Sequence, residues 1–220
     1  GVEGSYQYLG HSTWHQEDTR NNYRVGASSQ ARALALLLRN QYYLSNQWSV
    51  FAKLGVAYEQ LRRHVTCEAG NCTALPTSGR ADESRFYLNP ELQAGVAWSL
   101  TPTWQFNLAY QQLLGQSVAG YNRQTEQADS HINPSIASVL LGVDYQFSQV
   151  PGLRTVTRAP RGGWHVGVQA GSGVINTQEL SGSDGDSDDF YSLSNRSAMG
   201  NMYAGYDWGL SKRWLVGVEG

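Results

Sequence analysis

Between Phe86 and Gln111 the chain alternates apolar and polar side chains with a period of two, and this pattern constrains its fold more than any other feature. The even-numbered positions from Phe86 to Leu100 are apolar or proline, whereas most odd-numbered positions are polar or small. After a short turn at residues 101–103 the alternation resumes at Trp104. Such a long alternation indicates a sheet with one apolar and one polar face. The runs also match the roughly 9–11 residues with which a strand of a β-barrel crosses a membrane.

The composition is compatible with a membrane barrel and argues against other classes. A length of 220 residues allows one domain, and a formal net charge of −2 gives no electrostatic basis for binding nucleic acid. Charged residues make up 15% of the chain, against about 25% in an average globular protein. No apolar run approaches the roughly 18 residues of a transmembrane helix, so a membrane crossing must use strands.

The alternation predicts an all-β fold, an eight-stranded antiparallel transmembrane β-barrel with up-and-down meander topology, as a single domain over residues 1–220. We expect strands near residues 2–10, 31–44, 47–60, 85–100, 103–114, 135–147, 163–172 and 199–210. The connections at 45–46, 101–103 and 211–212 are short, and those at 11–30, 61–84, 115–134 and 173–198 are long and polar. Short turns at one end and four long loops at the other are typical of outer-membrane barrels.

The direction of the two faces decides between a membrane barrel and a soluble barrel with an apolar interior. The polar faces are mostly small and neutral, which suits the narrow lumen of an eight-stranded barrel better than a surface in water. Aromatic residues also gather at the strand ends beside the short turns, where an interfacial girdle is expected. We therefore predict lipid on the outside. The predicted interface aromatics are Trp48, Trp104, Trp164, Trp208, Trp214, Tyr145 and Phe147.

The two ends of the chain carry the same tetrapeptide, Gly-Val-Glu-Gly, at residues 1–4 and 217–220. The alternation that begins at Trp214 continues in phase to Tyr8, so the first and last segments are predicted to share one strand position. Residues 148–162 resemble a linker at the short-turn end. Two explanations fit: a circularly permuted barrel, or a segment cut across two tandem barrels. A chance recurrence of a glycine-rich tetrapeptide is the simplest alternative to both.

Before this linker, Tyr145-x-Phe147 resembles the aromatic signal that closes outer-membrane barrels. Read from Gly163 around to Phe147, nearly the whole chain resembles the small eight-stranded barrels of the outer-membrane protein A and X type. The resemblance lies in alternation, strand number, loop asymmetry and terminal aromatics, and not in a catalytic motif. It implies a protein of the Gram-negative outer membrane, with loops facing outward and a lumen plugged by side chains. The roles that it implies are anchoring, adhesion, surface protection and, at most, weak conductance.

The inward positions are predicted to carry a network of charges. Its members are Glu3 (or its copy Glu219), Arg39, Lys53, Glu59, Glu91, Asp144 and Asp207. Unpaired charges in a narrow, low-dielectric interior are costly, so we expect Arg39 and Lys53 to contact some of these carboxylates. The pairs would act as a structural plug that fixes strand register, or as an electrostatic gate in a pore.

Two polar segments have a functional and a simpler interpretation. Cys67 and Cys72, the only cysteines, form a local disulfide if the compartment is oxidising and remain free thiols otherwise; we predict the disulfide. The carboxylates Asp184, Asp186 and Asp188 alternate as in calcium loops. However, Asp189 stands where an EF-hand loop has glycine, so we favour a solvated acidic loop.

Catalytic and metal sites have little support. His11 and His15 lie four residues apart without further ligands. Residues 129–131 (Asp-Ser-His) are the only compact trio of acid, nucleophile and base, and sequence neighbours do not meet in the geometry that this chemistry requires. His165 faces the predicted lumen without a neighbouring serine.

The sequence therefore favours a non-enzymatic outer-membrane barrel with a structural or adhesin-like surface role and no cofactor. Membrane lipid and lipopolysaccharide are its expected partners, with a host or surface ligand on the long loops as a further candidate. A narrow pore with a charge-gated lumen is the second interpretation. A lipid-modifying outer-membrane enzyme is the third.

Overall fold

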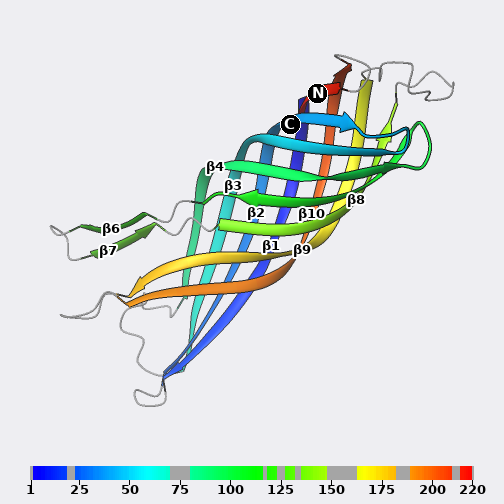
Figure 1. Cartoon of the computed structure of the whole chain (residues 1–220). Helices are drawn as coiled ribbons and strands as arrows, with labels where there is room; N and C mark the ends of the chain where they lie inside the picture. Colours follow the sequence, from blue (N-terminus) through cyan, green and yellow to red (C-terminus); the bar gives the residue numbers. More distant parts are fainter. Residues whose placement is uncertain are drawn as a thin grey trace.

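The chain folds into a closed antiparallel β-barrel (Figure 1). The computed structural model describes residues 2–18, 23–69, 80–115, 118–122, 127–131, 135–147, 163–181, 189–209 and 214–219. The strands are β1 Val2–Asp18, β2 Tyr23–Tyr43, β3 Trp48–Ala69, β4 Arg80–Ser99, β5 Trp104–Leu113, β6 Val118–Asn122, β7 Gln127–His131, β8 Ser135–Gln146, β9 Gly163–Ser181, β10 Asp189–Gly209 and β11 Trp214–Glu219. Within these segments, no helix has the length and hydropathy needed to span a membrane.

Each strand pairs with its neighbours along the chain, which confirms the predicted meander. β2, β3, β4, β5, β8, β9 and β10 follow one another around the barrel, and β1 closes it by pairing with both β10 and β2. β6 and β7 form a separate two-stranded hairpin between β5 and β8. The barrel thus has the eight strand positions that the alternation predicts.

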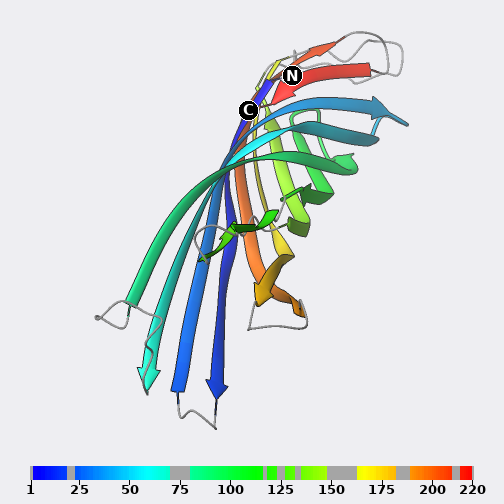
Figure 2. The same ribbon diagram turned by 90° about the vertical axis from the view of Figure 1, so that its left-hand side faces the viewer.

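The first and last segments share the position between β10 and β2, as predicted, and the two chain ends lie close together in Figures 1 and 2. β11 pairs with the β2 segment that leads to the first short turn, and β1 continues along β2 from Leu38 onward. Val2 and Val218 have the same two register partners, Leu38 and Tyr206. The repeated tetrapeptides are therefore assigned to one place in the wall, and the barrel needs only one of them there.

The strands are longer than the sequence analysis predicts. The β1–β2 ladder runs on to Asp18 and Tyr23, the β3–β4 ladder to Thr66 and Arg80, and the β9–β10 ladder to Ser181 and Asp189. Much of the sequence expected to form long loops is therefore paired strand. The apolar–polar alternation fades there because neither face meets lipid, while the backbone groups still pair with their neighbours.

β1 to β4 form a four-stranded extension, because they continue to pair with one another beyond the residues at which β1 pairs with β10 and β4 pairs with β5. Pairing between β1 and β10 ends at Tyr8, and pairing between β4 and β5 ends at Glu91. At Gly10 the φ angle is +109°, and a Cβ there would overlap the Ser197 side chain, so glycine suits the bulge at which β1 departs from β10. Figure 2 shows the four strands running on side by side beyond the closed part of the barrel.

Burial alternates along the spanning strands whose side chains are described, in the sense predicted for a membrane barrel. On β4, Leu92 and Val96 are exposed on the outside, whereas Glu91 and Gln93 between them are buried in the lumen. The exposed apolar side chains continue around the wall, and the interior holds polar and small residues together with a group of buried apolar side chains. This surface matches hydrocarbon, because it would be unfavourable in water over such an area.

Candidate functional site

The lumen is the candidate functional site, because it concentrates buried polar side chains contributed by every strand position. The buried polar and charged residues are Glu3, Ser5, Gln7, Arg39, Gln41, Ser49, Lys53, Glu59, Asn89, Glu91, Gln93, Ser99, Asn107, Gln111, Ser138, Asp144, His165, Gln169, Asn201 and Asp207. The set holds every charge-network residue of the sequence analysis except Glu219, whose side chain lies outside the described residues. Each occupies an inward position because strand residues alternate between faces.

An ion-pair cluster occupies the half of the lumen nearer the short turns. Lys53 Nζ donates to both carboxylate oxygens of Glu3, at 3.1 and 3.0 Å. Beyond this pair, His165 lies between two carboxylates, with Nε2 3.4 Å from Glu3 Oε2 and Nδ1 3.3 Å from Asp207 Oδ2. Lys53 Nζ also lies 4.4 Å from the centre of the Tyr203 ring, where a cation–π contact adds to the pair.

Arg39 extends this cluster to the mouth of the barrel. One guanidinium nitrogen donates to Gln41 Oε1 at 2.7 Å, and another lies 3.5 Å from His165 Nε2. The series of hydrogen bonds continues from Gln41, because its amide donates to Ser49 Oγ at 2.7 Å. A pocket at this mouth has a free volume of about 10 Å³, about the space of one water molecule. Its lining residues are Arg39, Gln41, Pro102, Thr103, Trp104, Gln105, Asp144, Gln146, His165 and Asp207.

A second chain of hydrogen bonds crosses the lumen beside the ion pairs. Asp144 accepts from the Tyr203 hydroxyl and, at 3.0 Å, from Asn107 Nδ2. Gln169 Nε2 donates to Asn107 Oδ1 at 2.8 Å, and Gln93 Nε2 donates to Gln169 Oε1 at 3.0 Å. The chain ties β4, β5, β8, β9 and β10 together through side chains, in addition to their backbone ladders.

Glu91 is surrounded by amide donors farther from the short turns. Gln7 Nε2 donates to both of its carboxylate oxygens at 2.9 Å, and Gln111 Nε2 donates to Oε1 at 2.7 Å. Glu59 accepts from Asn89 Nδ2 at 2.8 Å, and its other oxygen has no hydrogen-bond partner among the described residues. Amide donors can stabilise a buried carboxylate because each hydrogen bond to a charged group is a strong one.

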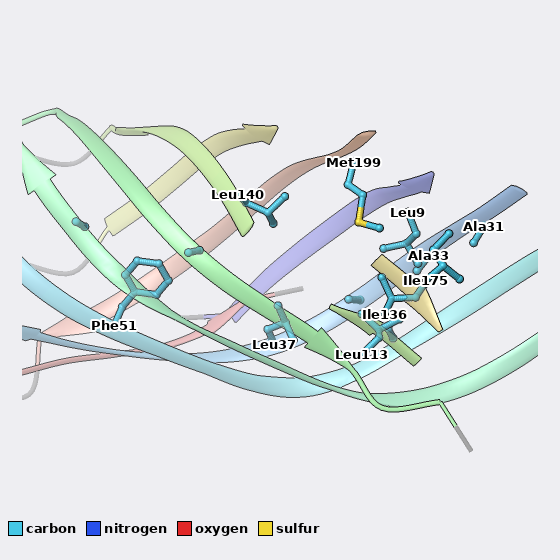
Figure 3. Packing of buried hydrophobic residues seen from close by; sticks show 14 residues of the cluster. Leu9, Ala31, Ala33, Leu37, Phe51, Leu113, Ile136, Leu140, Ile175 and Met199 are labelled. Atoms are coloured by element: carbon cyan, nitrogen blue, oxygen red, sulfur yellow. The ribbon is translucent and has the colours of Figure 1, made fainter. Parts of the chain in front are cut away.

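An apolar layer lies above these polar residues at the end from which β1 to β4 extend. Figure 3 shows its labelled side chains converging from several strands. The layer consists of Leu9, Ala31, Ala33, Leu113, Ile136, Ile175 and Met199, all of which are buried. Tightly packed apolar side chains leave little room for water at that end of the lumen.

Outside the barrel, most predicted interface aromatics lie exposed near the short turns. The exposed fractions are 50% for Trp48, 46% for Trp104, 61% for Trp164, 46% for Trp208 and 59% for Phe147, and Tyr145 is half-buried. Stacked and edge-on contacts join them to Trp98, Phe106 and Tyr206 in three groups. The side chain of Trp214 lies outside the described residues.

Several other predictions also fall outside the described residues. They concern the linker at 148–162, Cys72 of the predicted disulfide with Cys67, and the acidic positions Asp184, Asp186 and Asp188. The trio at 129–131 lies in β7, and its side chains are not among those described. His11 is exposed, and its backbone N–H donates to Ser197 Oγ at 2.8 Å. Among the described side chains, no group of three His, Cys, Asp or Glu residues could hold a metal ion.

Comparison with protein families identifies the barrel. The family model of the OmpA-like transmembrane domain matches residues 1–150. The chain belongs to this family. The match runs from β1 to the end of β8 and so includes the two aromatic residues that the sequence analysis compares with a barrel-closing signal. No curated protein matches the chain.

In this OmpA-like barrel the sequence analysis missed the amide and hydroxyl groups that connect the charges. Gln7, Asn107, Gln111 and Gln169 each form hydrogen bonds with other lumen side chains. The alternation in the sequence already predicts that these four residues face the lumen. Their partners, however, depend on which strands face each other across the lumen.

Proposed function

We propose that the chain is a non-enzymatic barrel of the bacterial outer membrane with a structural or surface-interaction role and a lumen plugged by side chains. Membership of the OmpA-like transmembrane domain family supports a membrane location of this kind. The lipid-facing apolar surface and the aromatic groups near the short turns support a spanning orientation. The filled lumen supports a role other than solute passage.

The observation that carries this proposal is the packing of the lumen at both ends. The mouth at the short turns has room for about one water molecule. At the other end Leu9, Leu113 and Met199 belong to the closing apolar layer and are at most 4% exposed. On this proposal, an ion has to displace buried side chains at both ends in order to pass.

Conductance in planar lipid bilayers tests the plug. We expect no resolved current steps from the parent barrel. The variant Leu113→Ser combined with Met199→Ser loosens the apolar layer, and its matched control is Leu114→Ser on an exposed neighbour of the layer. The layer variant is expected to show more frequent openings than the control. Stable steps from the parent barrel would contradict the plug.

The four-stranded extension of β1 to β4 supports the surface-interaction part of the proposal. It projects beyond the pairing limits at Tyr8 and Glu91, and so carries paired strands away from the membrane. Replacing residues 11–30 by a tight turn removes the β1–β2 arm and leaves the spanning segments in place. Bacteria that display the parent chain should adhere to abiotic or cell surfaces better than bacteria that display the shortened chain. Equal adhesion would contradict an adhesin-like role.

A charge-gated pore is the second candidate, and the imbalance of buried charge favours it specifically. Among the residues that the structure describes, the lumen buries five carboxylates and two permanent cations, with His165 beside them. A lumen that opened by exchange of ion-pair partners would then favour cations. Any current steps should reverse at a potential that shows cation selectivity; anion selectivity would contradict this reading.

We also infer that residues 1–220 form one barrel domain whose strand order is rotated relative to its family, with 148–162 as the connection between the usual ends. The family match ends just after β8, and Phe147 N–H donates to the Trp164 carbonyl at 2.9 Å, so β8 and β9 meet there. A chain rearranged to run from Gly163 through residue 220 and then from residue 5 to Phe147 should refold with the same gel mobility. Failure to close would favour a segment cut from tandem barrels.

A further inference from the structure

On the outer wall of β1 to β4, the surface changes from apolar to cationic within two rows of paired residues. We use "row" for residues that pair directly across these four strands. The last apolar row consists of Tyr6, Leu34, Tyr58 and Leu88. The next consists of Tyr8, Arg32, Gln60 and Phe86, and the one beyond it of His11, Gln30, Arg62 and Ser84.

The apolar row marks the edge of the surface that can contact hydrocarbon. Leu34 is 59% exposed and Leu88 is 68% exposed, which suits lipid and would be unfavourable in water. Tyr58 and Phe86 stack at a ring distance of 5.4 Å across this edge, as aromatic side chains do at a membrane interface. The two rows above it therefore lie at the depth of the lipid headgroups.

These two rows present hydrogen-bond donors and no carboxylate. Arg32 and Arg62 are both exposed on the outer face, and neither makes a hydrogen bond or ion pair with another described residue. Since Arg32 pairs with Gln60, Arg62 is its diagonal neighbour on the same face, with roughly 7–8 Å between the two positions. Gln60 lies between them, and its amide donates to Ser84 Oγ at 3.2 Å. Two guanidinium groups at this spacing can hold phosphate oxygens from two sides, because each presents a planar fork of donors.

We propose that Arg32 and Arg62 form a binding site for the phosphates of a phosphorylated glycolipid, such as the bisphosphorylated diglucosamine of the outer leaflet. The choice of this leaflet rests on the proposed function, which places the extension of β1 to β4 outside the cell. The arginines bind the phosphates, the apolar row below them contacts the acyl chains, and the amide and hydroxyl groups of the rows contact the sugar. The site would hold one lipid at a fixed place on the barrel wall.

Native mass spectrometry of the refolded full chain in a neutral detergent tests the site, with bisphosphorylated lipid A as the probe. We expect Arg32→Gln and Arg62→Gln each to weaken binding about tenfold, since each removes charge-assisted hydrogen bonds to phosphate. The matched control is Arg196→Gln, because Arg196 is also exposed on the outer face but lies on β10, two strands away from β2. It should change the affinity less than twofold. Gel mobility without heating confirms that each variant is folded.

Four outcomes would overturn the proposal. The first three are parent-like binding by the double variant R32Q/R62Q, an equal loss in R196Q, and equal binding of a lipid A from which both phosphates have been removed. Displacement of the probe by an equal concentration of phosphatidylglycerol would also overturn it, because the site would then recognise any anionic lipid. The experiment uses detergent and does not depend on the cellular location. Protease accessibility of the extension in intact cells tests that location separately.

Discussion

Replacing Lys53 by methionine should destabilise the barrel strongly, because it removes a buried cation and leaves its partner behind. The ammonium group is 3% exposed at the side chain and the Glu3 carboxylate 1%, with both carboxylate oxygens within 3.1 Å of Nζ. Removing one member of such a pair typically costs about 3–5 kcal/mol, since the remaining charge is buried without compensation. His165 can compensate only partly, because its Nε2 lies 3.4 Å from the same carboxylate.

The free energy of unfolding in lipid vesicles measures this effect, with urea as denaturant and the fluorescence of the seven tryptophans as the signal. The double variant K53M/E3Q should lose less than the sum of its two single variants, with a coupling energy of about 1–3 kcal/mol. Glu219→Gln is the matched control, because Glu219 shares the register partners of Glu3. It should change stability by less than about 0.5 kcal/mol.

The reasoning fails if K53M costs less than about 1 kcal/mol, which is the value of an exposed pair. The assignment of Glu3 as the partner is wrong if the coupling energy is found between Lys53 and Glu219 and not between Lys53 and Glu3. In that case the C-terminal copy of the tetrapeptide would fill the shared strand position.

Three further predictions concern the wall and the apolar layer. Leu92→Arg should lower the free energy of unfolding in lipid vesicles by about 2–4 kcal/mol. Leu88→Arg, which lies next to the rows that contain Arg32 and Arg62, should lower it by about 0–1 kcal/mol; equal losses would contradict the assigned depth. Gly55→Ala should impair folding because its Cβ would overlap the backbone carbonyl oxygen of Leu36 on β2, whereas Gly200→Ala, with its nearest contact at 3.5 Å, should fold normally; yields of folded barrel compare the two. Leu113→Ala should lower the unfolding free energy by about 2–5 kcal/mol, and a change below 1 kcal/mol would mean that the layer is loosely packed.

The spanning part of the fold could be predicted because lipid and lumen impose opposite demands on neighbouring residues. Leu92 is apolar and its neighbour Gln93 is polar, and the structure places the first on the lipid side and the second in the lumen. The strand ends could not be predicted in this way. Farther along β1 to β4 the outer face no longer meets hydrocarbon, so the sequence loses its alternation while the backbone ladder continues.

For the lumen, the sequence indicates which residues point inward but not which of them meet. Lys53 and Glu3 are far apart in the sequence, and their contact depends on the register and the closure of the whole barrel. Glu91 contacts Gln7 and Gln111, which an analysis based on charges passes over. The apolar layer has a signal in the sequence, because Leu113 on β5 continues the inward phase with an apolar side chain.

The central claim, a closed barrel with lipid outside and a packed polar lumen inside, is tested most directly by spin labels at two adjacent positions. Leu92→Cys and Gln93→Cys, in a background without Cys67 and Cys72, place a nitroxide on opposite faces of β4. In lipid vesicles we predict high accessibility to oxygen and low accessibility to a water-soluble nickel reagent at residue 92. At residue 93 we predict low accessibility to both. High nickel accessibility at residue 92 together with oxygen accessibility at residue 93 would contradict the account.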